Sequence, residues 1–175
     1  LGNMETGVET FTISNTDGHM SDLSVLDDFR IYDRVLSTEE INILYNQYNQ
    51  YIDIDKFRLT TSGLIAHYKF DGDLSNSVSS SIGTLTSTNT SASFIDTPGN
   101  YIFGKSALVN NTTLTIPSFH FSDLIVGTSK SFTISFWFKA NSISETWNIL
   151  FDASQYSGTD KGGIRVYLKR TTNEV

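Results

Sequence analysis

The chain has 175 residues, which is enough for one ordinary domain with its own core and too few for two complete domains. Hydrophobic residues make up 38% of it and aromatic residues 13%, a composition typical of a packed protein rather than a disordered one. The formal net charge is -7, and no basic cluster is longer than the stretch from Leu168 to Arg170. Nucleic acid and anionic membrane surfaces are therefore disfavoured as main partners, because both bind clustered positive charge.

The sequence contains no cysteine, so neither a disulfide framework nor a thiolate metal site is available. The longest apolar run, from Ile134 to Phe138, is interrupted by Ser135 and is far too short to span a bilayer. We therefore expect no membrane insertion. The first residue is Leu1 and not methionine, which is compatible with a window on a longer polypeptide.

A strand and a capped helix are predicted early in the chain. Residues 24–32 alternate apolar and polar side chains from Phe29 onward, which predicts a strand with one apolar face. Ser37 and Glu40 have the spacing of a capping box, in which each side chain binds the backbone amide of the other residue. The apolar residues that follow at helical spacing are Ile41, Leu44, Tyr45 and Tyr48. We expect this short helix to pack on the edge or end of a sheet.

A second start appears at Gly63, where the hydrophobic period becomes two. One face of this strand is predicted to hold Leu64, Ala66, Tyr68 and Phe70, and the other Ile65, His67 and Lys69. Further strands are predicted at residues 107–109, 113–116, 131–140, 148–153 and 163–170, after a stretch rich in Ser, Thr and Asn at residues 75–93. Many short strands and one convincing helix indicate an all-β fold, an antiparallel β-sandwich or jelly roll with one short helix.

Several stretches resemble the laminin-G-like, or concanavalin A-like, jelly-roll superfamily. The sequence GLIAHYKFDGD at residues 63–73 looks like the opening strand of that family, and FTISFWFKA at residues 132–140 looks like its central strand. Between them, GKSAL at residues 104–108 resembles the family's Gly-x-x-Ala-Leu element. The stretch from Asp27 to Ile41 looks like the closing strand and helix. The order in this chain is therefore end, linker, beginning.

Two domain organisations explain this order. In the preferred one, residues 1–50 are the closing strands and helix of one laminin-G-like module, residues 51–61 are a linker, and residues 62–175 are the opening two-thirds of a second module in tandem. The alternative is one circularly permuted sandwich over residues 1–175, since the first and last strands of the family are neighbours in one sheet. An extended linker of about twelve residues spans roughly 40 Å, which is enough for that arrangement.

Catalysis is not expected within this window. The Glu-x-Asp-x-x-Glu pattern of the related glucanases does not occur in the sequence. Glu39 and Glu40 are explained by a helix N-terminus, where negative charge is favoured. The histidines, at positions 19, 67 and 120, lie near no nucleophile motif.

Calcium is the candidate cofactor. The resemblance points to Asp27, before the closing strand, and to Asp71 and Asp73, after the opening strand, as carboxylates that could converge on one ion. In the alternative interpretation, Asp71 and Asp73 only make turns around Gly72. Asp27 or Asp28 then pairs with Arg30 or Arg34.

A lectin-like surface is predicted from three further residues. Trp137 lies opposite the apolar face of its strand, and Arg165 and Tyr167 lie opposite the apolar face of theirs. We predict that the three share one polar, aromatic-bearing sheet face, which suits a glycan because sugar rings stack on aromatic planes. In the alternative, loops or a neighbouring module cover the face of Trp137.

The expected function is a non-catalytic, lectin-like recognition module of a larger extracellular, cell-surface or virion-surface protein, with a glycan or a protein as partner. A close alternative is a structural module in a surface assembly, such as an adhesin stalk or a virion component, whose faces bind neighbouring subunits. A third possibility is the accessory domain of a glycoside hydrolase, with catalytic carboxylates outside these residues.

Overall fold

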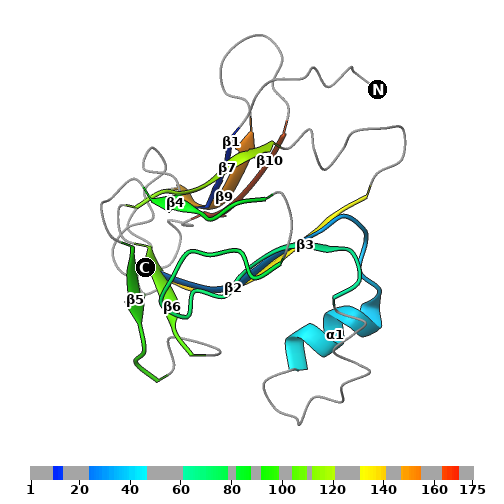
Figure 1. The fold of residues 1–175 in the computed structure, drawn as a ribbon, viewed down its shortest axis with the longest axis horizontal. Coiled ribbons are helices and arrows are strands. Elements are labelled where there is room, and N and C mark those ends of the chain that lie inside the picture. Colours follow the sequence, from blue (N-terminus) through cyan, green and yellow to red (C-terminus); the bar gives the residue numbers. More distant parts are fainter. Residues whose placement is uncertain are drawn as a thin grey trace, which may run out of the picture.

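The computed structural model describes residues 10–13, 24–46, 61–78, 82–87, 92–98, 104–109, 112–120, 131–140, 147–154 and 163–169. These residues form two antiparallel sheets and one short helix (Figure 1). The predicted class, an all-β sandwich with one helix, is confirmed. Among the described residues, no helix is long and apolar enough to cross a membrane.

The first sheet, called sheet A, has five strands. They are β1 (Thr10–Ile13), β4 (Thr86–Ser87), β7 (Leu114–His120), β9 (Trp147–Ser154) and β10 (Gly163–Lys169). Their order across the sheet is β10-β9-β1-β7-β4, so the strand that comes first in the chain is hydrogen-bonded on both sides. Phe11 and Ile13 of this central strand are fully buried.

The second sheet, called sheet B, is built around one long strand. Its members are β2 (Ser24–Tyr32), β3 (Leu64–Tyr68), β5 (Ser93–Ile95), β6 (Ser106–Val109) and β8 (Thr133–Lys139). Strand β8 pairs with β2 from Val25 to Tyr32 and so occupies one edge of it. On the other edge, β6 pairs with residues 24–26 and β3 pairs with residues 29–32. One strand thus holds three partners.

The change of partner along β2 occurs at a bulge. The register between β2 and β8 shifts between Asp27 and Arg30. Within that shift Asp28 adopts a left-handed backbone conformation, with φ of 54°. Aspartate tolerates this conformation better than most residues, and bulges of this kind bend a strand and re-aim its side chains.

The core lies between the two sheets and is rich in aromatic residues. Phe11 of β1 packs against Phe151 of β9, with ring centroids 4.4 Å apart, and Phe29 of β2 stacks on Phe136 of β8 at 5.5 Å. Ring pairs at these separations stabilise a core beyond the burial of their area alone. Contacts among strands distant in sequence therefore hold the sandwich together.

The predicted face pattern of β3 is wrong at its start. The register between β2 and β3 shifts between Ile31 and Tyr32, so Tyr32 lies opposite Leu64 while Ile31 lies opposite Ala66. A shift of one residue moves side chains to the other face of a sheet. Leu64 consequently packs with Tyr32 under the helix, and Ile65 packs against the main core.

Helix α1 (Thr38–Asn46) lies at one end of sheet B, on the side that faces away from sheet A (Figure 1). Its buried Leu44 packs with Tyr32 and Leu36 in a second, smaller core. The predicted helix and its capping box are confirmed, since the Glu40 amide donates to Ser37 Oγ at 3.2 Å and the Ser37 amide donates to Glu40 Oε2 at 2.8 Å. Tyr48, the last residue of the predicted stripe, lies outside the described residues.

Strands from the predicted closing segment, β1 and β2, lie in the same two sheets as the strands from the predicted opening segment. Strand β2 pairs directly with β3, which is the pairing that a permuted sandwich requires. The division of the chain into tandem modules stays a prediction.

Candidate binding groove between the helix and strand β8

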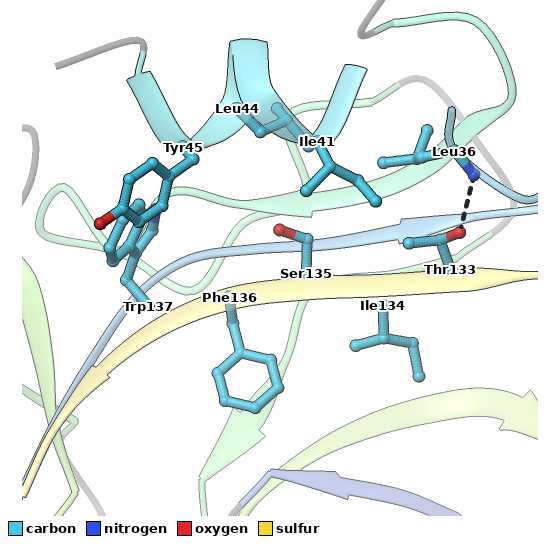
Figure 2. Close-up of a pocket in the computed structure, with 9 residues that line it drawn as sticks. All are labelled: Leu36, Ile41, Leu44, Tyr45, Thr133, Ile134, Ser135, Phe136 and Trp137. Atoms are coloured by element: carbon cyan, nitrogen blue, oxygen red, sulfur yellow. Dashed lines mark hydrogen bonds between the residues drawn. The ribbon is translucent and has the colours of Figure 1, made fainter. Parts of the chain in front are cut away.

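A groove of about 370 Å³ lies between α1 and β8 (Figure 2). The residues that line it are Leu36, Ile41, Leu44, Tyr45, Thr133, Ile134, Ser135, Phe136 and Trp137. Within β8, Thr133, Ser135 and Trp137 point toward the helix, whereas Ile134 and Phe136 point away from it (Figure 2). This is the alternation that the sequence predicts for the strand.

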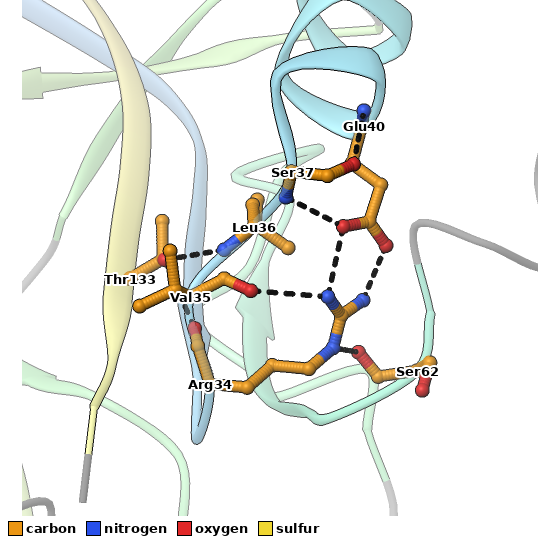
Figure 3. A network of polar contacts seen from close by, with 7 residues as sticks. All are labelled: Arg34, Val35, Leu36, Ser37, Glu40, Ser62 and Thr133. Carbon is orange, nitrogen blue, oxygen red and sulfur yellow. Dashed lines mark hydrogen bonds and ion pairs between the residues drawn. The ribbon is translucent and has the colours of Figure 1, made fainter.

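The helix is held over the strand by a polar network around Arg34 (Figure 3). The Arg34 guanidinium binds the Glu40 carboxylate at two points, and its Nε donates to the Ser62 carbonyl at 2.8 Å. The hydrogen bonds from Arg34, together with those from Ser37, lower the pKa of the Glu40 carboxyl to about 2. The start of the helix is thereby tied both to its own cap and to the turn that leads into β3.

The hydroxyl group of Thr133 joins this network to β8. The Leu36 amide donates to Thr133 Oγ1 at 3.1 Å, and the same hydroxyl donates to the Arg34 carbonyl at 2.9 Å (Figures 2 and 3). Both hydrogen-bonding roles of a hydroxyl are used here. Thr133 therefore fixes the distance between the helix start and the strand, which sets the width of the groove at this end.

An aromatic pair forms the other end of the groove. The ring of Tyr45 stacks on the indole of Trp137, with centroids 5.5 Å apart and an interplanar angle of 24°. Tyr45 is 64% exposed and Trp137 is half-buried. The pair offers a broad apolar surface beside the Ser135 side chain, which also points into the groove (Figure 2). An aromatic plane next to a hydroxyl group can hold the apolar face of a ligand and bind its polar groups.

Sequence reasoning missed Tyr45 as a candidate site residue. Its spacing from Ile41 placed it on the apolar stripe of the helix, which predicts core packing. Only the position of α1 over Trp137, which depends on the register of β2 and β8, brings the two rings together.

The predicted grouping of Trp137 with Arg165 and Tyr167 is wrong. Trp137 lies on β8, which pairs with β2 in sheet B, whereas Arg165 and Tyr167 lie on β10, which pairs with β9 in sheet A. Arg165 binds the buried Asp152 of the neighbouring strand, with 2.9 Å from Nε to Oδ2. Tyr167 follows a register shift and is 44% exposed. Strand alternation could not reveal which sheet each strand joins.

The three carboxylates predicted for calcium have different surroundings. Asp27 is buried within β2. Asp71 Oδ1 accepts a hydrogen bond from the Lys105 amide at 3.0 Å. Asp73 Oδ1 accepts from the Ser75 amide and hydroxyl, which lowers the pKa of the Asp73 carboxyl.

Across the part of the chain that the structure describes, no group of three or more His, Cys, Asp or Glu side chains is placed to hold a metal ion. Calcium binding by Asp27, Asp71 and Asp73 stays a prediction. Of the alternative turn roles, Asp73 makes a turn with Ser75, whereas Asp71 binds the backbone of Lys105, which is distant in the chain.

A buried charged cluster lies at the bulge of β2. The alternative prediction of an aspartate–arginine pair is confirmed for Asp28 and Arg30, whereas the sequence did not indicate His67 as the third member. Asp28 Oδ1 accepts from Arg30 Nη2 at 2.9 Å and is 2.5 Å from His67 Nε2 of β3. Burial alone would raise the pKa of the Asp28 carboxyl, but the hydrogen bond with His67 and the charge of Arg30 outweigh it and lower that pKa. The cluster fastens the second half of β2 to β3, because Arg30 and His67 are direct partners across the two strands.

No family model, curated protein or solved structure matches the chain. The groove and its aromatic pair are therefore the basis on which a function is argued.

Proposed function

We propose that the protein is a non-catalytic recognition module that binds a glycan or a protein ligand in the groove between α1 and β8. The single observation that supports this is the stacked pair of Tyr45 and Trp137 beside Ser135, with Tyr45 64% exposed. A single exposed ring is ordinary on a protein surface, but this ring is stacked on a second one and the pair borders a concave site, which is typical of a ligand site.

A glycan suits the groove on chemical grounds. The C-H face of a pyranose ring can stack on the exposed ring of Tyr45, while its hydroxyl groups bind the Ser135 side chain and the rim. The resemblance to laminin-G-like and concanavalin A-like modules points in the same direction. The proposal therefore places the protein outside the cell, on a cell surface or on a virion surface.

Binding is tested with an immobilised panel of neutral oligosaccharides, followed by NMR titration of the 15N-labelled chain. The expected shifts map to the amides of Ser135, Trp137 and Tyr45. Tyr45→Ala should weaken binding about fivefold to tenfold, the amount that one lost stacking contact explains. Tyr167→Ala, which removes an exposed tyrosine from the other sheet, is the matched control and should leave the affinity unchanged.

Comparison of the two variants shows whether the groove or the outer side of β10 is the binding site. Equal affinity of the wild type and Tyr45→Ala would overturn the proposed site. Loss of binding in Tyr167→Ala alone would move the site to the outer side of β10.

A second candidate function is a structural module in a surface assembly. Exposed apolar side chains on and before the helix support it, since Val35 is 62% exposed and Ile41 52%. Such a surface can bury against a neighbouring subunit. Sedimentation equilibrium of the wild type and of Val35→Ser/Ile41→Ser distinguishes the two candidates, because only assembly through this surface predicts self-association that the double substitution removes.

A further inference from the structure

The segment that carries β1, β2 and α1 supplies the central strand of both sheets. In sheet A, β1 lies between β7 and β9. In sheet B, β2 lies between β8 on one edge and β6 with β3 on the other. We call this part, residues 10–46, the central segment. All other described strands come from residues 64–169.

The central segment fills a gap in each sheet between the other described strands, and we call the two gaps together the cleft. Without β1, the described part of sheet A would consist of two separate strand pairs, β10-β9 and β7-β4. Without β2, strands β3 and β8 would each lose their described partner. The cleft would thus expose unpaired strand edges on both sides, and such edges bind any strand that offers a matching pattern.

The matching pattern lies on the central segment itself. Phe11, Ile13, Phe29 and Ile31 are fully buried between the sheets. Every contact that the segment makes with the cleft is a non-covalent strand pairing or a side-chain contact. These contacts have the same geometry whether the segment comes from the same chain or from another copy.

The connection to the cleft permits both arrangements. Residues 47–60 join the end of α1 to the turn at Thr61. A chain of that length spans on the order of 45 Å when extended. A linked segment has an effective concentration in the millimolar range, so closure within one chain dominates in dilute solution and exchange becomes competitive when copies are concentrated.

We propose that the cleft accepts the central segment of a second copy of this chain, so that copies are joined by segment exchange. The groove would then be formed by two copies, because Tyr45 comes from the central segment and Trp137 from the rest of the chain. This inference does not depend on what the groove binds. The partner is a second copy of the chain, because its central segment can make the same strand pairings that the segment makes within one chain.

Paired cysteine variants of the full chain test the exchange. The chain has no cysteine of its own. Val25 and Lys139 are direct partners across β2 and β8, so their Cα atoms lie within the range that a disulfide bridges. Chains with Val25→Cys and chains with Lys139→Cys are mixed in urea, refolded together at about 1 mM and oxidised. The covalent heterodimer is quantified by mass spectrometry.

The expected product is a disulfide-linked dimer of one chain of each kind, at twice the chain mass of 19.5 kDa. Its yield should exceed severalfold that of a mixture in which Lys139→Cys is replaced by Asp96→Cys, an exposed position outside the cleft. Refolding the two chains separately before mixing should abolish it. A yield equal to the Asp96→Cys control, or only monomers when the unmodified chain is refolded at the same concentration, would overturn the proposal. Loss of glycan binding in Tyr45→Ala has no bearing on this result.

Discussion

The guanidinium of Arg34 meets the carboxylate of Glu40 at two points, with 2.8 Å from Nη1 to Oε2 and 2.5 Å from Nη2 to Oε1. The carboxylate also accepts the Ser37 amide, so one side chain closes the helix cap and anchors the chain before it (Figure 3). Planar pairs of this kind are among the stronger charged hydrogen bonds.

Glu40→Ala should therefore destabilise the protein by about 1–2 kcal/mol, because it removes the cap acceptor and the ion pair together. Glu40→Gln keeps an oxygen for the Ser37 amide but loses the charge and the hydrogen bond that the second carboxylate oxygen accepts from Arg34, so a cost of about 0.5–1 kcal/mol is expected. Urea unfolding followed by circular dichroism measures both. Glu39→Ala, at the exposed neighbouring position, is the control and should change stability by less than about 0.5 kcal/mol.

The same pair predicts a pH dependence. The pKa of Glu40 is about 2 in the folded protein, against an ordinary value of 4.5. The charge of Glu40 therefore stabilises the fold fully above pH 4.5, and this contribution is lost as the pH falls toward 2. The stability difference between the wild type and Glu40→Gln should shrink over that window. A difference that stays constant would show that the ion pair does not contribute.

Asp28→Ala should destabilise the protein by about 3–5 kcal/mol, because it leaves the charge of Arg30 buried without its carboxylate. Asp28→Asn should cost less, since asparagine tolerates the left-handed backbone and keeps one acceptor. Thermal unfolding of both variants measures the order. Asp96→Ala, on an exposed residue, is the reference. The reverse order, with Asn worse than Ala, would contradict the assigned role of the cluster.

Tyr45→Ala should change the emission of Trp137, because it uncovers one face of the indole. The measurement is made in a Trp147→Phe background, where Trp137 is the only one of the two tryptophans that remains. A red shift of the emission maximum is expected, with a loss of stability of about 1 kcal/mol or less. An unchanged spectrum would mean that the two rings are not stacked in solution.

Gly104→Ala should destabilise the protein by about 1–3 kcal/mol. Gly104 has a positive φ of 59°, and a Cβ at this position would overlap Asp71 Oδ1. Adding Asp71→Ala should recover part of the loss, because it removes the overlap but not the backbone strain. Gly83→Ala is the control, since a Cβ there meets nothing within 4 Å. Urea unfolding of the wild type, Gly104→Ala, Asp71→Ala and the double variant completes the cycle.

The sequence predicts those features that depend on nearby residues. The capping box needs only Ser37 and Glu40 at a fixed spacing, and the two faces of β8 need only alternation. The structure agrees with both. The fold class follows from many such short patterns taken together.

The sequence did not predict the features that depend on pairing between strands distant in the chain. Trp137 and Tyr167 occupy equivalent positions in their own strands, yet their strands join different sheets. Likewise, nothing local to Leu64 indicates the register shift that turns it toward the helix. Bulges and strand order arise from the packing of the whole core, and one displaced residue reverses a face.

The position of β2 also determines which part of the protein opens last. Its peptide groups are hydrogen-bonded to β8 on one edge and to β6 and β3 on the other. The side chains of Leu26, Phe29 and Ile31 are fully buried. Exchange of its amide hydrogens with solvent requires separation of sheet B along its middle, which approaches global unfolding. The amides of Leu26, Phe29 and Ile31 should therefore exchange most slowly, and those of the two-residue strand β4 should exchange early.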